Sequence, residues 1–97
     1  MKDLKEKIII LSSKQISAIM QIIIVLSERK ELLSSELQRN IKASNETYYK
    51  ARKILVENDL IYQKIYEFAP NNPWCLTEKG NKAVESIKLF IPILYGD

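Results

Sequence analysis

Hydrophobic residues recur at helical spacing in several stretches of the chain, and a residue that can cap a helix precedes each stretch. Ser12 and Gln15 have the spacing of a capping box, in which the serine accepts a hydrogen bond from the third amide and the glutamine bonds back to the cap. The apolar stripe that follows consists of Ile16, Ile19, Met20, Ile23 and Leu26. This pattern predicts a helix over residues 12–30.

Three further helices are expected from the same two signals. Ser34 or Ser35 can cap a helix over residues 34–42, and Ser44 can cap a helix over residues 44–58. Thr77 can cap a last helix over residues 77–91. The expected inward positions of the second and last helices are Leu37, Ile41, Val84, Ile87 and Ile91. Pro92 is expected to end or kink the last helix, because proline cannot donate a backbone hydrogen bond.

Between the last two helices the pattern changes to short runs rich in Ile, Tyr and Phe. A turn signal, Ala-Pro-Asn-Asn-Pro over residues 69–73, separates a first strand from a second strand at residues 74–76. We therefore expect a β-hairpin over residues 60–76. Its aromatic residues are expected to pack against the first helix; they are Tyr62, Tyr66, Phe68 and Trp74.

These elements predict a mainly α protein with a small β-hairpin, in the order helix, helix, helix, strand, strand, helix. Residues 1–97 form one domain in this interpretation, with residues 1–11 as an N-terminal segment before the first helix.

The expected helix over residues 44–58 divides into two sides when it is projected at about 100° per residue. Tyr48, Ala51 and Leu55 share one side, which we assign to the core. The other side carries one tyrosine beside two lysines, together with two acidic residues; its members are Glu46, Tyr49, Lys50, Lys53 and Glu57. An outward-facing tyrosine between lysines is an unusual choice for a solvated helix surface, so this side is more typical of a binding surface.

The charge pattern supports a polyanionic partner. The chain has a net charge of +3, and the segment from Glu36 to Lys53 alone carries five cations and two acids, which equals that surplus. A basic patch confined to one segment is typical of nucleic-acid binding, although a solvated helix face has the same composition.

Other function classes lack the residues they need. The chain has no histidine and one cysteine, Cys75, so neither a metal site, a cofactor nor an enzymatic centre is expected. Cys75 is interpreted as a small core residue rather than a redox switch. The longest apolar run, residues 22–26, is far too short to span a membrane, and we expect a cytoplasmic protein.

The element order and several local motifs resemble the winged helix-turn-helix regulators of the MarR, PadR and ArsR kind. The motifs are the Leu32-Leu33 step, Ser34-Ser35-Glu36-Leu37, the segment from Leu55 to Ile61, and above all Leu76-Thr77-Glu78-Lys79-Gly80. The resemblance covers residues 11–91. It implies that the third helix lies in the major groove of double-stranded DNA and that the wing touches the minor groove or the backbone.

The resemblance and the charge pattern together give the residues expected to contact DNA. These are Ser44, Asn45, Glu46, Thr47, Tyr49, Lys50, Lys53, Arg39, Lys42, Arg52, Lys64, Asn71 and Asn72. The sequence departs from the family pattern at two places. The wing turn carries no arginine, with only Lys64 nearby, and Asp59 stands where these families often have glycine.

A homodimer is expected because the chain has more apolar surface than one small core can cover. The second half of the first helix is apolar nearly all round, since Ile22, Ile24 and Val25 lie off its stripe. The residues expected at the interface are Ile8, Leu11, Ile22, Val25, Ile87, Phe90, Ile91 and Leu94. Such a dimer would bind a near-palindromic site with half-sites about 10 bp apart. The alternative is a monomer whose N-terminal run folds back on the last helix.

The sequence therefore predicts a dimeric, sequence-specific transcriptional regulator. One alternative of the same fold is a centromere-binding partition protein of an archaeal plasmid, or a viral DNA-binding factor. An alternative from another class is a winged helix that only contacts proteins.

Overall fold

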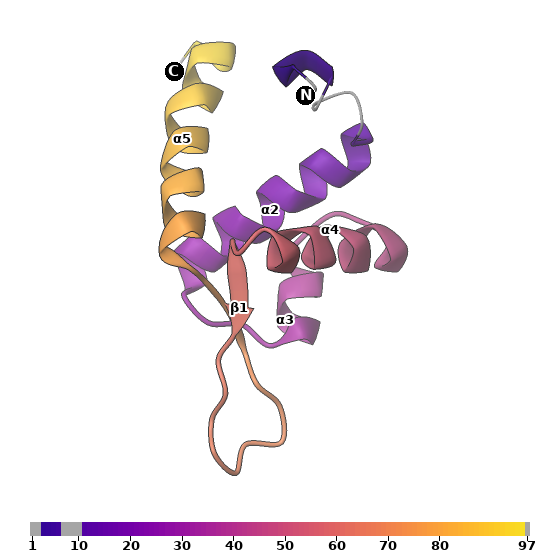
Figure 1. The fold of residues 1–97 in the computed structure, drawn as a ribbon, viewed down its shortest axis with the longest axis vertical. Helices are drawn as coiled ribbons and strands as arrows, with labels where there is room; N and C mark the ends of the chain where they lie inside the picture. The colour runs from indigo at the N-terminus through magenta and orange to yellow at the C-terminus, as the bar shows by residue number, and fades with distance from the viewer. Residues whose placement is uncertain (1–2, 7–10, 97) are drawn as a thin grey trace.

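The computed structural model describes residues 3–6 and 11–96 of the chain. After a single helical turn at residues 4–6, the elements are α2 (Ser13–Arg29), α3 (Ser34–Arg39), α4 (Asn45–Glu57), β1 (Ile61–Gln63), β2 (Trp74–Leu76) and α5 (Glu78–Tyr95). The predicted class, mainly helical with one antiparallel hairpin, is confirmed. In Figure 1, α2 and α5 diverge upward from a common base, α4 lies below α2, and the hairpin extends away at the opposite end.

The start of α2 has the predicted capping box. The Ser12 hydroxyl accepts a hydrogen bond from the Gln15 amide at 3.1 Å, and the Gln15 side chain accepts one from the Ser12 amide at 3.3 Å. The helix ends at Arg29, and Lys30 follows it with φ 69°. Both bonds use orphan amides of the first turn, so the helix start is fixed by local sequence.

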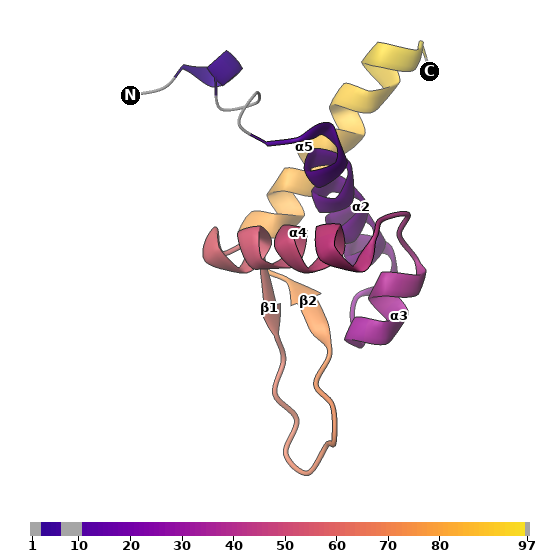
Figure 2. The same cartoon turned by 90° about the vertical axis from the view of Figure 1, so that its right-hand side faces the viewer.

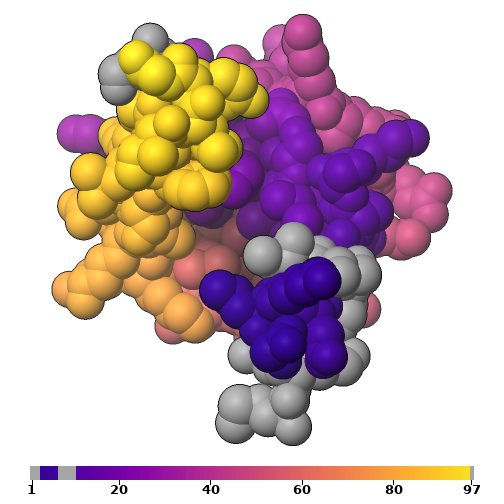
Figure 3. All heavy atoms as spheres, turned by 90° about the horizontal axis from the view of Figure 1, so that it is seen from above, coloured from indigo at the N-terminus to yellow at the C-terminus, as the bar shows by residue number. Residues whose placement is uncertain are grey.

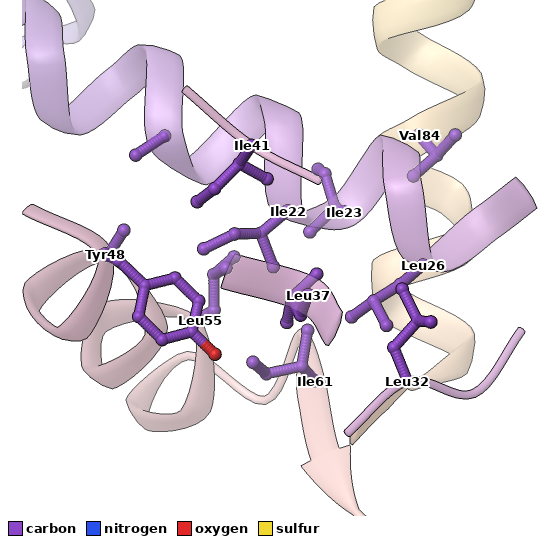
Figure 4. Close-up of a cluster of buried hydrophobic side chains, with 12 residues drawn as sticks. Ile22, Ile23, Leu26, Leu32, Leu37, Ile41, Tyr48, Leu55, Ile61 and Val84 are labelled. Atoms are coloured by element: carbon purple, nitrogen blue, oxygen red, sulfur yellow. The ribbon is translucent and has the colours of Figure 1, made fainter. Parts of the chain in front are cut away.

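The core forms where α2 crosses α4, with α3, β1 and α5 closing its sides (Figure 4). Tyr48 and Leu55 of α4 are fully buried against α2, as predicted from the helical projection. The buried apolar residues are Ala18, Ile22, Ile23, Leu26, Leu32, Leu37, Ile41, Tyr48, Ala51, Leu55, Ile61 and Val84. Ile22 is among them with no exposed surface, so its assignment to a dimer interface is wrong. It lies off the stripe because α2 is covered on more than one side within a single chain.

Helix α3 differs from the prediction at both ends. Its cap is Leu33, whose amide donates to the Glu36 carboxylate at 3.0 Å, so neither Ser34 nor Ser35 caps it. It ends at Arg39, three residues early. At this end the Glu36 carbonyl accepts from both the backbone amide of Asn40 at 3.2 Å and its side-chain amide at 2.7 Å, an arrangement that favours a turn over a further helical turn.

Helix α4 ends in a Schellman motif built around Asp59. The amide of Asp59 donates to the Val56 carbonyl at 3.1 Å, and the amide of Leu60 donates to the Leu55 carbonyl at 2.9 Å. Asp59 has φ 59°, in the left-handed region that glycine adopts most easily. The exit therefore keeps its geometry although the residue is not glycine.

The Leu-Thr-Glu-Lys-Gly motif joins α5 to the end of α4. The Thr77 hydroxyl accepts from the Gly80 amide at 3.0 Å and donates to the Asp59 carbonyl at 2.6 Å. The Lys79 ammonium donates to the Asn58 carbonyl at 2.9 Å. Each of these contacts fixes the start of α5 against the exit of α4.

Helix α5 continues through Pro92 to Tyr95, so the prediction that it ends at Ile91 is wrong. Proline removes the bond to the carbonyl of Lys88, but this residue is exposed and water can replace the bond. Gly96 ends the helix in the left-handed conformation, with its amide donating to the Pro92 carbonyl at 2.7 Å.

The hairpin is paired only at its base. Ile61, Tyr62 and Gln63 pair with Leu76, Cys75 and Trp74, and Leu32 forms an additional bridge to Trp74 on the other side. Beyond this base the hairpin runs away from α2 and past α4 (Figure 2). Trp74 packs against the core, but Tyr62, Tyr66 and Phe68 are exposed. The prediction that these three pack on the first helix is wrong for Phe68, which is 95% exposed. Tyr62 reaches only the end of α2, where it borders a hollow with Leu26 and Ser27, and the Tyr66 hydroxyl donates to Glu31 just past that helix.

Candidate nucleic-acid interface

The outer side of α4 is a polar, partly aromatic surface. Ser44 caps the helix, accepting from the Thr47 amide at 3.2 Å, and so fixes its first turn. The opposite side is buried against α2, which leaves Tyr49 at 50% exposure beside two lysines. The exposed residues brought together here are Asn45, Glu46, Tyr49, Lys50, Lys53 and Glu57. They coincide with the outward side predicted from the sequence.

The two lysines of this surface are paired only with neighbours on the same helix. Lys50 lies 3.0 Å from Glu46, and Lys53 lies 4.0 Å from Glu57, with all four side chains largely exposed. Exposed pairs of this spacing contribute roughly 0.3–0.5 kcal/mol. Both ammonium groups can therefore exchange these partners for an external anion at little cost.

Arg52, which the sequence analysis assigned to DNA contact, is engaged with neighbouring side chains. Its guanidinium donates to the Ser34 hydroxyl at 2.9 Å and lies 4.9 Å from the ring centres of both Tyr49 and Trp74. It also lies 5.5 Å from the ring of Tyr48. The side chain is half-buried: it makes these contacts within the protein and also lines an open hollow with Lys53 and Glu57 on the outer side of α4.

The turn before α4 extends the basic surface toward α2. The Gln21 side chain accepts from the Lys42 amide at 2.7 Å and donates to its carbonyl at 3.3 Å, which fixes the turn. A hollow of about 590 Å³ opens beside it. Its lining residues are Ser13, Lys14, Ser17, Lys42, Ala43, Ser44 and Thr47. The sequence did not indicate Ser13, Lys14 and Ser17, because only the packing of α2 on this turn brings them there. Arg39 is exposed on α3.

The polar residues of the wing are engaged with the protein. Lys64 lies 3.1 Å from the Glu31 carboxylate, and the Tyr66 hydroxyl donates to the same group. Tyr66 and Glu31 raise the pKa of Lys64, and Tyr66 and Lys64 lower the pKa of Glu31. The Asn72 side chain accepts from the Tyr66 amide at 2.9 Å.

The tip of the wing is apolar and exposed. Phe68 is 95% exposed and has φ 68°. Asn71 is exposed beside it, as the sequence-based assignment to DNA contact requires, but no cation accompanies it between residues 67 and 73. Any wing contact with an anion would depend on Asn71 and on backbone amides.

Other kinds of site find little support in the described part of the chain. Cys75 is buried, as predicted, and burial raises the pKa of its thiol. Residues 3–6 and 11–96 contain no cluster of three potential metal ligands. Within the same ranges, none of the helices has the length and apolarity required to cross a membrane.

Comparison with known proteins shows a likeness of fold. No family profile and no curated protein matches the chain. The F-93 protein of SSV1 superposes with a TM-score of 0.67 at 19% identity, over 81% of this chain and 90% of that one. AF1382 from Archaeoglobus fulgidus gives a TM-score of 0.67 at 18% identity, over 94% of this chain and 99% of that one.

A MarR family transcriptional regulator from Silicibacter pomeroyi gives a TM-score of 0.69 at 22% identity. The match covers 81% of this chain but only 53% of the regulator, so the chain spans about half of that protein. These similarities confirm the winged helix-turn-helix fold expected from the motifs, with α3 and α4 as the helix-turn-helix and the hairpin as the wing.

Proposed function

We propose that this protein binds double-stranded DNA sequence-specifically as a homodimeric transcriptional regulator, with α4 in the major groove. The observation that carries the proposal is the outer side of α4. A single α-helix fits the major groove, and this one presents Tyr49, Lys50 and Lys53 away from the core.

The residues of this surface divide by chemistry. Asn45 and Glu46 can hydrogen-bond the edges of adenine and cytosine, and Tyr49 offers both an apolar ring and a hydroxyl. Lys50, Lys53, Lys42 and Arg39 supply exposed cations for the phosphates on either side. The neighbouring wing is proposed to follow the adjacent groove, in contact through Asn71 and backbone amides.

The proposed dimer rests on apolar surface at the end of the molecule opposite the wing. Figure 3 looks onto this end, with α5 in yellow and α2 in purple, and Figure 1 shows the two helices diverging toward it. A groove between them is lined largely by apolar side chains, among them Ile16, Met20, Ile24, Ile87 and Ile91. On α5, Phe90, Ile93 and Leu94 are exposed, Ile93 at 76%. A second copy that covers this surface is the simplest partner.

The test is affinity for the DNA upstream of the protein's own gene against random DNA, titrated with salt. The proposal requires tighter binding to one near-palindromic sequence and a steep loss of affinity as salt rises. If the protein binds neither DNA at about 50 mM salt, DNA binding is ruled out and the protein-contact alternative is favoured. Cooperative binding to an array of repeated sites would instead support the partition alternative.

A further inference from the structure

Arg52 connects three elements of the proposed interface. Ser34 comes from α3, Tyr48 and Tyr49 come from α4, and Trp74 comes from β2. The guanidinium touches all of them through one hydrogen bond and three ring contacts. The helix-turn-helix and the base of the wing therefore meet at one side chain.

The inner part of this cluster is buried and hydrogen-bonded. Tyr48 has no exposed surface, and its hydroxyl lies 2.9 Å from the Ser34 hydroxyl that also accepts from Arg52. A guanidinium is planar and stacks on aromatic faces while keeping its hydrogen bonds, which a lysine ammonium cannot do. Arg52 is thus held on one side by atoms that belong to the core.

The outer part of the cluster is the half-exposed ring of Tyr49. It meets the Tyr48 ring edge to face at 5.1 Å, and Arg52 lies 4.9 Å from its centre. An unsupported surface tyrosine would have to give up its rotamer freedom when it bound, which weakens binding. The contacts with Tyr48 and Arg52 restrict the ring before any ligand arrives.

The wing is held by the same group. Trp74 pairs with Gln63 across the hairpin and with Leu32 on its other side, so it fixes the direction of the wing base. The Arg52 guanidinium lies 4.9 Å from its ring. Arg52 therefore contacts the wing base as well as the outer side of α4.

We propose that Arg52 is a positioning residue for DNA specificity: it holds the Tyr49 ring and the wing base in the arrangement that reads a sequence, without contacting DNA itself. This inference rests on the proposed DNA-binding function. Its consequence is that Arg52 and Tyr49 act as one unit, although only Tyr49 faces the groove.

A double-mutant cycle tests the coupling. Arg52→Met and Tyr49→Ala are each expected to lower the ratio of specific to random-DNA affinity by roughly 5- to 150-fold, the range of one lost base contact. The double variant is expected to lose no more than the larger single loss. Losses that multiply, or a Tyr49→Ala variant with full specificity, would overturn the proposal.

Lys53→Met is the matched control, since it removes a neighbouring cation that is exposed at 78%. It is expected to weaken all sequences alike and to reduce the slope of log affinity against log salt by about 0.9 per contact. Arg52→Met is expected to leave that slope unchanged. If it lowers the slope and spares the specificity ratio, Arg52 is a phosphate contact and the proposal is wrong.

Two milder variants keep the test valid if Arg52→Met does not fold. Arg52→Lys keeps the charge, and Ser34→Ala removes the hydroxyl that bonds to Arg52 and Tyr48. Both variants are expected to lose specificity; full specificity in Arg52→Lys would refute the positioning role. Trp74 is the only tryptophan, so its fluorescence reports the cluster directly. It is expected to shift to the red in Arg52→Lys but not in Lys53→Met. If the wild-type protein binds no DNA, the proposed DNA-binding function itself is wrong.

Discussion

The backbone of Gly80 packs so closely on Leu60 that a Cβ atom added to Gly80 would lie 2.2 Å from the Leu60 carbonyl oxygen. The oxygen cannot retreat easily, because it also accepts a hydrogen bond from the Thr77 amide at 3.1 Å. The start of α5 can therefore approach the exit of α4 only if residue 80 has no side chain.

Gly80→Ala is expected to destabilise the protein by about 3 kcal/mol, at the upper end of the usual cost of overpacking, because the clash is with backbone. Urea unfolding followed by circular dichroism measures the change. Ser86→Ala on the exposed side of α5 is the control and is expected to be nearly neutral. A Gly80→Ala variant as stable as this control would contradict the tight joint.

Asp59→Gly is expected to stabilise the protein by up to about 1 kcal/mol, because Asp59 has φ 59° and glycine adopts this conformation without strain. Removing a carboxylate from a helix C-terminus acts in the same direction. Asp59→Ala keeps the strain and is the matched comparison. The expected order of urea midpoints is Gly above Asp and Asp above Ala; Gly below Asp would show that the carboxylate has a role not visible in its contacts.

Lys50→Ala is expected to weaken binding to specific and random DNA equally, and to reduce the salt slope by about 0.9 per contact. The reason is that its present partner, Glu46 at 3.0 Å, is exposed and can be exchanged for phosphate. Fluorescence anisotropy at several salt concentrations checks this. A change in sequence preference without a change in slope would place Lys50 on a base edge instead.

The wing base is expected to loosen in acid. The Tyr66 hydroxyl and Lys64 hold the pKa of Glu31 below its usual value of 4.5, so the folded state favours the carboxylate. The stabilisation is present above pH 4.5 and is lost as the pH falls through the lowered pKa. The urea midpoints of wild type and Glu31→Gln should therefore converge as the pH is lowered toward 3. A difference between the two midpoints that does not change with pH would contradict this prediction.

Phe90→Lys is expected to give a monomer, because Phe90 lies on the apolar surface of α5 that a second copy is proposed to cover. Phe68→Lys in the wing is the control, since this ring is even more exposed, at 95% against 51% for Phe90, but lies at the other end of the molecule. Sedimentation at micromolar concentration separates the two. Wild-type protein with the mass of a single chain at every concentration would rule out the dimer.

The features that could be predicted from the sequence are those fixed by near neighbours. The capping pair Ser12 and Gln15 lies within one turn, and the division of Tyr48 from Tyr49 follows from helical geometry alone. Pro92 misled the prediction because a helix close to its end loses little when one exposed carbonyl is hydrated.

The features that could not be predicted depend on contacts between distant parts of the chain. Serine is a residue type that often caps helices, yet the Ser34 hydroxyl hydrogen-bonds to Tyr48 and Arg52, which are 14 and 18 residues away. Lys14 joins Lys42 at one hollow only because Gln21 holds the turn against α2. Local patterns identify what a residue can do, whereas packing decides which of its partners is within reach.

The contacts of the Leu-Thr-Glu-Lys-Gly motif bear on how function can be transferred between proteins. The motif contacts the residues at the end of α4 through Thr77, Lys79 and Gly80. None of these three residues belongs to the outer side of that helix. Two proteins that share this motif are thus expected to share the angle between α4 and α5 while binding unrelated DNA sequences. A genome search with the motif would therefore find proteins of one fold. Which DNA sequence each of them binds would have to be inferred from the residues at positions 45–53.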